Sequence, residues 1–347
     1  MHINTFTAQT FRNLTRAELA PCPGVNVIFG ENGQGKTALL EAIWLFTGCR
    51  SFRCADAREM ITETHDRSLL SVNFISNQRE QSASLELQRR RTLTLNGFPQ
   101  ETPRRMLGVF PAVAFTPATL SIAQGGPGER RRFLDVALSM LTPAYAVRLS
   151  KYLKALAQRN ALLRQPSCDP ALLDTWDATL ARHAQEITAA RLRYLEQLIP
   201  IACDFYTGIS AARETLGIEI QLTGHDYSTS RQTDLRRQTT TVGPHRDDLV
   251  LTLNQRSLRE YGSQGQQRSA ALALKLAEAT VLREATGECP IALLDDVLSE
   301  LDARRQTDLL RYLEGWQVFL TCCEPSHALH GRAGRIFCVT DGNITQA

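Results

Sequence analysis

The sequence lacks several features that would mark it as a membrane, secreted or metal-binding protein. No run approaches the ~18 uninterrupted apolar residues of a membrane-spanning helix, and the first residues have neither the basic segment nor the apolar core of a secretory signal. The nine cysteines are scattered and include no Cys-x-x-Cys pair, so we expect structural or free thiols rather than a zinc site. His327 and His330 have no cysteine partner and are interpreted as surface residues. These absences favour a cytoplasmic protein.

The sequence also has little excess of positive over negative charge. The 347 residues carry a formal net charge of only +3, which does not by itself indicate a nucleic-acid-binding protein. The arginines are nevertheless gathered in short runs at 89–91, 104–105, 130–132 and 236–237. Solvated helix and loop faces are the simplest interpretation of each run. A phosphate-binding patch would need several of them on one face.

Hydrophobic periodicity divides the chain into three segments, which we expect to form an α/β domain, split in sequence, with a helical insertion. Residues 1–125 are β-rich, with strands expected at 25–29, 69–75, 83–87, 92–95 and 110–115. Asn96-Gly97 predicts a type I′ hairpin. Residues 126–238 have the spacing of long amphipathic helices, interrupted near Asp169, an expected N-cap, and Pro170. In residues 239–347 strands are expected at 249–253, 291–294, 317–320 and 336–339, and helices at 264–285 and 301–313.

The strongest motif is a phosphate loop between the strand 25–29 and the helix that follows it. Its glycines allow backbone N–H groups to wrap phosphates at the positive end of the helix. In this context Lys36 is expected to reach the β- and γ-phosphates of ATP, and the Thr37 hydroxyl to bind Mg²⁺. The loop consists of Gly30, Glu31, Asn32, Gly33, Gln34, Gly35, Lys36 and Thr37.

Two carboxylates follow the apolar strand 291–294. Ligands of open α/β sheets bind at the carboxyl ends of the strands, which is where Asp295 and Asp296 lie. Asp295 suits a Mg²⁺ contact, and Asp296 is placed to orient or deprotonate an attacking water. Alone, such a pair could equally be a turn or a cap; beside a phosphate loop it predicts a catalytic role together with Lys36.

A third motif opens the helix expected from residue 264. Ser263, Gly265 and Gln266 place a hydroxyl, a backbone amide and a helix dipole where they would attract an anion. The simpler interpretation is a helix cap with a polar first turn. Because the chain already has one phosphate loop, we expect these residues to complete the ATP site of a second molecule. Ser299-Glu300-Leu301-Asp302 would then lie at the same shared interface.

In this order the motifs are those of ABC-type ATPases, and the helical insertion resembles the SMC-like branch. Over nearly the whole chain the sequence resembles the RecF family. The matching segments are 11–14, the phosphate loop with 40–43, 51–53, 126–127, 130–135, 159–160, 243–248 and 294–302.

The resemblance implies an ABC-type head (a mixed sheet with helices) with an inserted helical arm: head at 1–125, arm at 126–238, head again at 239–347. It implies a DNA-binding ATPase of recombinational repair that dimerises around ATP and Mg²⁺, binds DNA at single-strand gaps, and with RecO and RecR helps to load RecA during replication restart and the SOS response. Hydrolysis would be weak and DNA-stimulated. Arg12 is then expected to contact a phosphate or the adenine side, and residues 243–248 to support the site from the head's second half.

Three departures from the general ABC pattern stand out. The strand ending at Phe115 is followed by no glutamine where a Q-loop belongs, and the strand 317–320 runs into Thr321-Cys322-Cys323 without a switch histidine. Asp296 replaces the usual glutamate, and its shorter side chain would hold the water less well. We therefore expect slow hydrolysis.

Two other classes of protein share some of these motifs. The nucleotide-binding subunit of an ABC transporter should carry a Q-loop and a shorter insert, and would co-purify with a membrane permease. An SMC-type structural protein would have far longer helical arms, usually with a hinge or a Cys-x-x-Cys hook. The sequence favours the repair ATPase over both.

Overall fold

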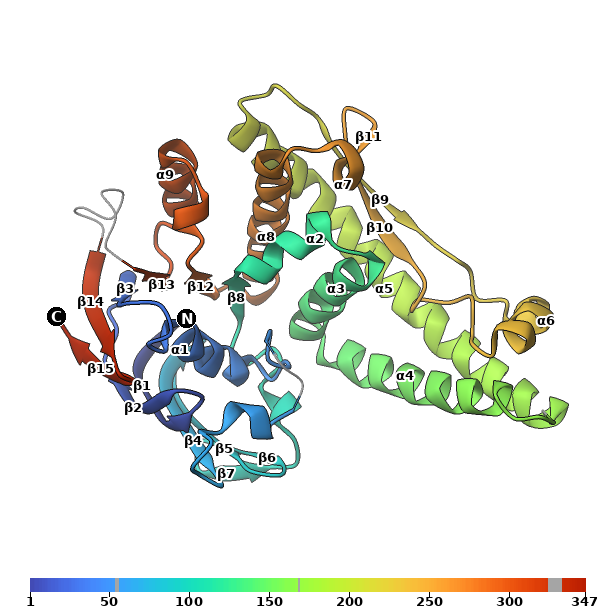
Figure 1. Ribbon diagram of the computed structural model, residues 1–347, viewed down its shortest axis with the longest axis horizontal. Helices are drawn as coiled ribbons and strands as arrows, with labels where there is room; N and C mark the ends of the chain where they lie inside the picture. The colour runs from blue at the N-terminus through green and yellow to red at the C-terminus, as the bar shows by residue number, and fades with distance from the viewer. Residues whose placement is uncertain (54–55, 168, 324–332) are drawn as a thin grey trace. The chain divides into compact units, whose positions relative to one another are not determined.

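The computed structural model describes residues 1–53, 56–167, 169–323 and 333–347 (Figure 1). The chain forms two compact units: residues 1–120 with 275–347, called here the head unit, and residues 121–274, called the arm unit. His327 and His330, which the sequence indicated to be surface residues, lie outside the described residues. Within the described part, no helix is long and apolar enough to cross a membrane.

A twelve-stranded mixed sheet organises the head unit. Its strand order is β7-β6-β5-β4-β1-β2-β15-β14-β3-β13-β12-β8. The last five of these strands run parallel, whereas β7 to β2 form an antiparallel meander. The bounds are β1 His2–Phe11, β2 Leu14–Leu19, β3 Val25–Phe29, β4 Ser68–Ser76, β5 Arg79–Leu87, β6 Arg91–Leu95, β7 Phe98–Gln100, β8 Ala112–Phe115, β12 Ile291–Asp295, β13 Val318–Cys322, β14 Ala333–Thr340 and β15 Asn343–Gln346.

The parallel strands are the buried centre of the head unit. Every residue of β12 and β13 is buried, as their continuous apolar runs require. Helix α1 packs on this sheet against β1, β2, β12 and β13. The helices of the unit are α1 Lys36–Trp44, α9 Ala303–Tyr312 and the second half of α8 Gln264–Thr286, with short 3₁₀ turns at Leu45–Thr47, Arg58–Met60, Pro103–Met106, Pro117–Leu120 and Leu298–Glu300.

The expected hairpin at Asn96-Gly97 is confirmed. β6 and β7 pair across it, and the two residues have φ of 51° and 79°. Two successive positive φ angles define the type I′ geometry that the dipeptide predicts.

The arm unit is mainly helical and carries a small antiparallel sheet of order β11-β10-β9. Asp169 accepts a hydrogen bond from the Ala171 amide and Pro170 is the first residue of α5, so both predictions at this helix start are confirmed. The elements are α2 Ser121–Gln124, α3 Pro127–Leu141, α4 Pro143–Leu163, α5 Pro170–Ser210, β9 Leu216–Gln221, α6 Tyr227–Arg237, β10 Asp248–Leu253, β11 Arg256–Ser257, α7 Leu258–Tyr261 and the first half of α8.

Buried arginines hold the arm helices together. Arg159 of α4 donates to Asp177 at 2.6 Å and to Asp234 at 2.7 Å, and it is completely buried. Arg191 of α5 donates to Asp135 at 2.8 Å. Such groups are tolerated in a core only when they are paired and hydrogen-bonded, as these are.

Residues 243–248 belong to this network, which corrects their expected place in the head. Arg191 donates to the Pro244 carbonyl at 2.7 Å, and Arg130 of α3 forms a two-bond ion pair with Asp248. Arg130, the first residue of the run at 130–132, is therefore paired within the arm.

The boundaries between the two units follow residues 120 and 274, whereas the sequence pattern predicted them after residues 125 and 238. The larger difference has a clear cause. Strand β10 was expected from its apolar alternation, but it pairs antiparallel with β9 and so stays with the arm. Its partner lies some thirty residues earlier in sequence, where the alternation of Leu216, Ile218 and Ile220 was the available signal.

Candidate functional site

The phosphate loop joins β3 to α1 in a conformation that only glycine adopts. Gly30 has φ of 152° and Gly35 has φ of 122°. A Cβ on Gly30 would lie 2.4 Å from the Val339 carbonyl oxygen, and one on Gly35 would lie 2.6 Å from a Leu14 methyl carbon. Both the backbone angles and the close neighbours therefore require glycine here.

Neighbouring segments of the chain hold the phosphate loop in place through hydrogen bonds to its side chains and to one of its carbonyls. Asn13 donates through its side chain to the Gly33 carbonyl, and the Gln34 side chain accepts from the Asp341 amide at 2.6 Å. The Cys323 thiol lies 3.3 Å from the Asn32 side-chain oxygen. The loop is thus held in place by its side chains and carbonyls.

Lys36 and the start of α1 form a positive end to this loop. The Lys36 side chain donates to the carbonyls of Gly30 and Glu31, the latter at 3.0 Å, and only 8% of the residue is exposed. The N-cap, Gly35, provides no side-chain hydrogen bond, and the first turn has no acidic residue. A helix N-terminus of this kind, with an ammonium beside it, fits an anionic phosphate group.

Asp295 lies beside the end of the phosphate loop. The Thr37 hydroxyl donates to its Oδ1 at 2.8 Å, and the Thr321 hydroxyl donates to the same oxygen at 3.0 Å. Burial raises the pKa of Asp295 above its ordinary value, although the two hydroxyls partly oppose this shift. A bound divalent cation would replace the proton and favour the charged form.

The protein supplies few ligands for such a cation. Among the described residues, no three His, Cys, Asp or Glu side chains gather as a metal-binding group. One carboxylate and one hydroxyl, completed by phosphate oxygens and water, is a donor set that Mg²⁺ accepts. Thr37 and Asp295 fit this pattern.

Asp296 follows in a constrained backbone conformation. Its φ is 53°, and its amide donates to the Thr321 hydroxyl at 2.9 Å. Ser299 donates to the Asp296 carbonyl at 2.7 Å, and Asp302 caps α9 by accepting from the Arg305 amide. The motif 299–302 therefore supports the turn after β12. Thr321, which sequence reasoning missed, orients both aspartates, and its position at the end of the neighbouring parallel strand was the available signal.

Arg12 is held by a residue that the sequence did not single out. Its guanidinium donates twice to the buried Glu41 of α1, at 3.1 and 2.9 Å, and once to the Glu59 carbonyl at 2.6 Å. Ser51 also donates to Glu41. Glu41 therefore ties the end of β1 and the segment 51–60 to the helix that carries the phosphate loop.

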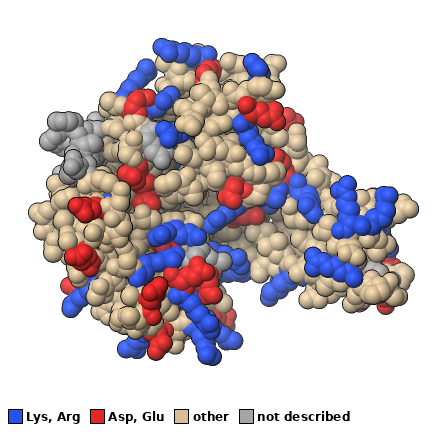
Figure 2. Space-filling model, in the orientation of Figure 1, with Lys and Arg blue, Asp and Glu red and all other residues tan. Residues whose placement is uncertain are grey.

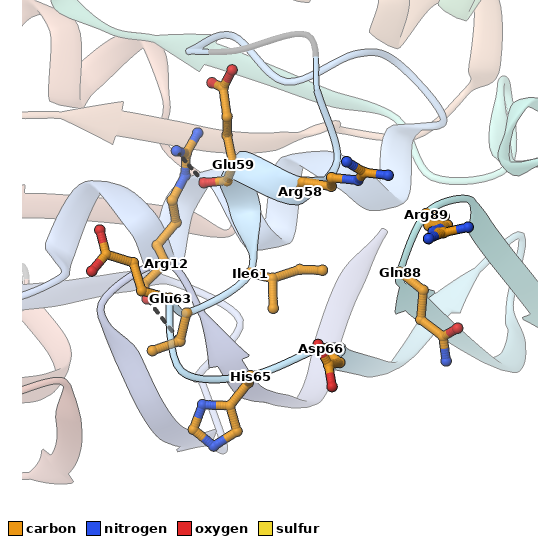
Figure 3. Close-up of a pocket in the computed structure, with 10 residues that line it drawn as sticks. Arg12, Arg58, Glu59, Ile61, Glu63, His65, Asp66, Gln88 and Arg89 are labelled. Carbon is orange, nitrogen blue, oxygen red and sulfur yellow. Dashed lines mark hydrogen bonds between the residues drawn. The ribbon is translucent and has the colours of Figure 1, made fainter.

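A pocket of about 650 Å³ opens beside Arg12. Figure 3 shows Arg12 on one wall, with Gln88 and Arg89 across from it. Asn13 contacts the phosphate loop while the neighbouring Arg12 carbonyl accepts from Thr62 at 2.7 Å, so the pocket lies close to the loop. It is lined by Arg12, Arg58, Glu59, Ile61, Thr62, Glu63, His65, Asp66, Gln88 and Arg89.

Ser263 and Gln266 form a capping box at the start of α8. The Ser263 amide donates to the Gln266 side chain at 2.6 Å, and the Gln266 amide lies 3.3 Å from the Ser263 hydroxyl. Gln266 also donates to Glu214 at 2.5 Å. This is the simpler of the two expected arrangements. Ser263 and Gln264 are nevertheless exposed, and Gly265 is half-buried, so this helix start is accessible from outside.

Phosphate loop, strand-end aspartates and mixed sheet together define an ATPase head of the ABC type. In agreement, the family described as RecF/RecN/SMC N terminal domain matches residues 2–331. An SMC head bound to a winged-helix domain of ScpA is similar in fold, with a TM-score of 0.60 over the whole chain at 15% identity.

Relatives of higher sequence identity show to which family of ABC-type ATPases the chain belongs. The chain is 33% identical to the DNA replication and repair protein RecF of Lachnospira eligens over 99% of both chains, and 35% identical to that of Listeria innocua over 100% of both. A solved structure of the recombination mediator protein RecF with ATP, in the RecFOR pathway, has a TM-score of 0.90 and 33% identity and covers 100% of this chain and 99% of its own. The chain belongs to the RecF family.

Proposed function

We propose that this chain is a DNA-binding ATPase of recombinational repair whose ATP-bound form is a dimer. The observation that carries the proposal is full-length similarity to a RecF solved with ATP, combined with a phosphate loop, Lys36 and Asp295 in one site. The transporter subunit that shares these motifs is not favoured, since the relatives that cover the whole chain are repair proteins.

In this proposal the head unit binds ATP through the backbone of residues 30–35. Lys36, which donates to the Gly30 and Glu31 carbonyls, would turn to the β- and γ-phosphates, and Thr37 and Asp295 would hold Mg²⁺. The pocket beside Arg12 has the size and the mixed polar lining to receive the nucleoside, with Arg12 on its phosphate side. Mg²⁺, when bound, neutralises the charge that develops on the transferred phosphoryl group.

Asp296 is the proposed general base for the attacking water. Thr321 fixes its backbone at 2.9 Å, so the carboxylate has a defined starting point. An aspartate reaches less far than a glutamate, and a loosely held water reacts slowly. Weak hydrolysis suits a protein in which ATP binding closes a dimer and hydrolysis reopens it.

The second half of each site is proposed to come from another molecule. Ser263, Gly265 and Gln266 would present a hydroxyl, an amide and the α8 dipole to the γ-phosphate held by the partner's loop. Ser263 is exposed, so another molecule can reach this helix start.

The biological role follows from the family. We propose that the ATP-bound dimer binds duplex DNA beside single-strand gaps, that DNA stimulates its hydrolysis, and that with RecO and RecR it promotes loading of RecA in replication restart and SOS induction.

Gel-shift titration of gapped and fully duplex DNA tests the proposal. The wild type with ATP should bind at least tenfold more tightly than without nucleotide, because only the closed dimer presents the full surface. Lys36→Met should abolish this difference and leave the nucleotide-free baseline unchanged. Binding that ignores both ATP and Lys36→Met contradicts the proposal.

Dimer formation is tested by light scattering with a non-hydrolysable ATP analogue. Ser263→Arg should leave ATP binding intact and remove the dimer, since the added side chain would fill the space meant for the partner's γ-phosphate. A dimer that survives this change rules out the shared site.

A further inference from the structure

Helix α4 of the arm unit has an unusual distribution of charge. Its 21 residues include Arg148, Lys151, Lys154 and Arg159, and no aspartate or glutamate. Arg159 is turned inward, where it is paired with Asp177 and Asp234. The other three cations lie on the outer side of the helix or near it, without a carboxylate of their own helix to neutralise them.

The exposed side of α4 is a regular stripe. Exposed residues recur at Ala144, Val147, Lys151, Lys154 and Gln158, which is the three- and four-residue spacing of one helix face. Small or neutral residues flank the two lysines. A partner could therefore approach this face without meeting a negatively charged side chain of the helix.

The neighbouring helix α5 adds a further cation to the stripe. Arg182 is exposed on α5. Burial, followed by the charge of Arg182, lowers the pKa of His183, and Lys151 and Arg148 contribute in the same direction. These cations therefore lie close together in space. The one carboxylate that opposes them, Glu186, is already paired with Arg148.

Several other arginines of the arm and of α9 are neutralised by carboxylates. Arg130, Arg191 and Arg231 are ion-paired, as are Arg304, Arg305 and Arg311. In contrast, Lys151, Lys154 and Arg182, called here the α4 face, form no ion pair with any carboxylate in the described parts of the chain. Figure 2 shows Lys and Arg side chains over the region of α4 and α6, with few acidic ones among them.

We propose that the α4 face contacts the sugar–phosphate backbone of duplex DNA without reading its sequence. This rests on the proposed function, from which it takes DNA as the partner. Lys151 and Lys154 are separated by about 4.5 Å along the helix axis, a spacing that lets both reach phosphates of one strand. Lysine is a point charge that suits such contacts, and nothing on this face is shaped to recognise base edges.

The exposed residues of the α4 face do not favour binding of single-stranded DNA. Proteins that bind single strands stack bases on exposed aromatic side chains. The aromatic residues of α4, Tyr145 and Tyr152, are 1% and 0% exposed, and the large apolar residues exposed on the helix are the aliphatic Val147 and Leu153. Duplex phosphates therefore fit the surface better.

Salt dependence of DNA binding tests the inference. The variant Lys151→Gln/Lys154→Gln is titrated by fluorescence anisotropy against two duplexes of different sequence, with the non-hydrolysable ATP analogue, between 50 and 200 mM salt. Each lost phosphate contact removes about 0.9 from the slope of log K against log salt. For each chain of the dimer that the duplex contacts, we expect the slope to fall by about 2 and the Kd near 0.1 M salt to weaken by about 60-fold, for both duplexes. Adding Arg182→Gln should extend the loss.

Arg104→Gln/Arg105→Gln is the matched control. It removes the same charge from two exposed arginines of the head unit and should change the slope by much less. Basal ATP hydrolysis and the ATP-dependent dimer should be unchanged in the lysine variant, which separates lost DNA contact from misfolding.

The outcomes separate the two proposals. A wild type that binds no duplex in the presence of ATP overturns the proposed function and this inference together. A wild type that binds duplex, with a lysine variant of unchanged slope or a control variant that loses as much, overturns the inference alone. A loss confined to single-stranded DNA would also contradict it.

Discussion

At the residue scale, Asp295 combines burial with a charge that only a ligand can compensate. It accepts hydrogen bonds from Thr37 and Thr321, and burial raises its pKa. Asp295→Asn keeps an acceptor for both hydroxyls and removes the buried charge. We expect the melting temperature of the nucleotide-free protein at pH 8 to rise by about 2 °C, roughly the shift that 1 kcal/mol produces in a chain of this size. Mg²⁺-dependent hydrolysis should fall by about 100-fold or more.

The stabilisation should depend on pH in a defined direction. Because the folded-state pKa is raised, the wild-type carboxyl favours folding below its unfolded pKa, and this contribution is lost as the pH rises through the folded pKa. The advantage of Asp295→Asn is therefore full above the raised folded-state pKa and shrinks as the pH falls from there toward the ordinary pKa of aspartate. Thermal melts of both proteins across this range check it; a constant or growing difference would contradict the assignment.

Cys323 offers a direct probe of the phosphate loop. It is exposed, and its sulfur lies 3.7 Å from the Lys36 ammonium and 3.3 Å from the Asn32 side chain. A nucleotide in the loop would cover it. We expect ATP with Mg²⁺ to slow alkylation of Cys323 by iodoacetamide about tenfold or more, followed by peptide mass spectrometry. Cys203, in the arm unit, is the internal control and should react at the same rate with and without ATP. Equal rates at Cys323 would place the nucleotide elsewhere.

At the element scale, α1 carries the phosphate loop and is anchored through Glu41. This carboxylate is fully buried and satisfies Arg12 with two hydrogen bonds. Glu41→Gln removes the buried carboxylate that pairs with Arg12, and breaking a buried pair in this way costs about 3–5 kcal/mol. We expect a loss of this order in denaturant unfolding, together with weaker ATP binding.

Glu18→Gln serves as the control for Glu41→Gln. Glu18 pairs with Arg16 on the surface, where both side chains are more than half exposed. Exposed ion pairs contribute at most about 1 kcal/mol, so this variant should unfold close to the wild type. If the two variants unfold alike, the anchor described for α1 is wrong.

Elements with a local signal were predictable from the sequence, whereas those defined by distant partners were not. The strand, loop and helix around Lys36 follow from a glycine pattern that a single segment contains. β10 was also foreseen as a strand, yet its pairing with β9 placed it in the arm, because register depends on a partner elsewhere in the chain. Glu41 was missed for the same reason: a glutamate in a helix pattern predicts solvent exposure until Arg12 and Ser51 are seen to meet it.

At the scale of the whole molecule, a shared site makes activity a property of two chains. Lys36 belongs to the head unit and Ser263 to the arm unit. If one ATP is held by Lys36 of one molecule and Ser263 of another, Lys36→Met and Ser263→Arg should each be inactive alone. A mixed dimer would still contain one complete site, built from the intact loop of one variant and the intact helix start of the other.

Mixing the two inactive variants tests this arrangement. Because neither variant is expected to form an ATP-dependent dimer by itself, the mixed dimer is the species that can close around ATP. It has one working site of two, so up to about half of wild-type ATPase activity should return. The control carries both changes in one chain; mixed with either single variant, it should restore nothing, since no intact loop can then meet an intact helix start. The recovered rate should also rise with the square of total protein at low concentration, because association of two chains creates the site. A mixture that remains inactive while each variant still dimerises with the wild type would show that each chain hydrolyses ATP alone.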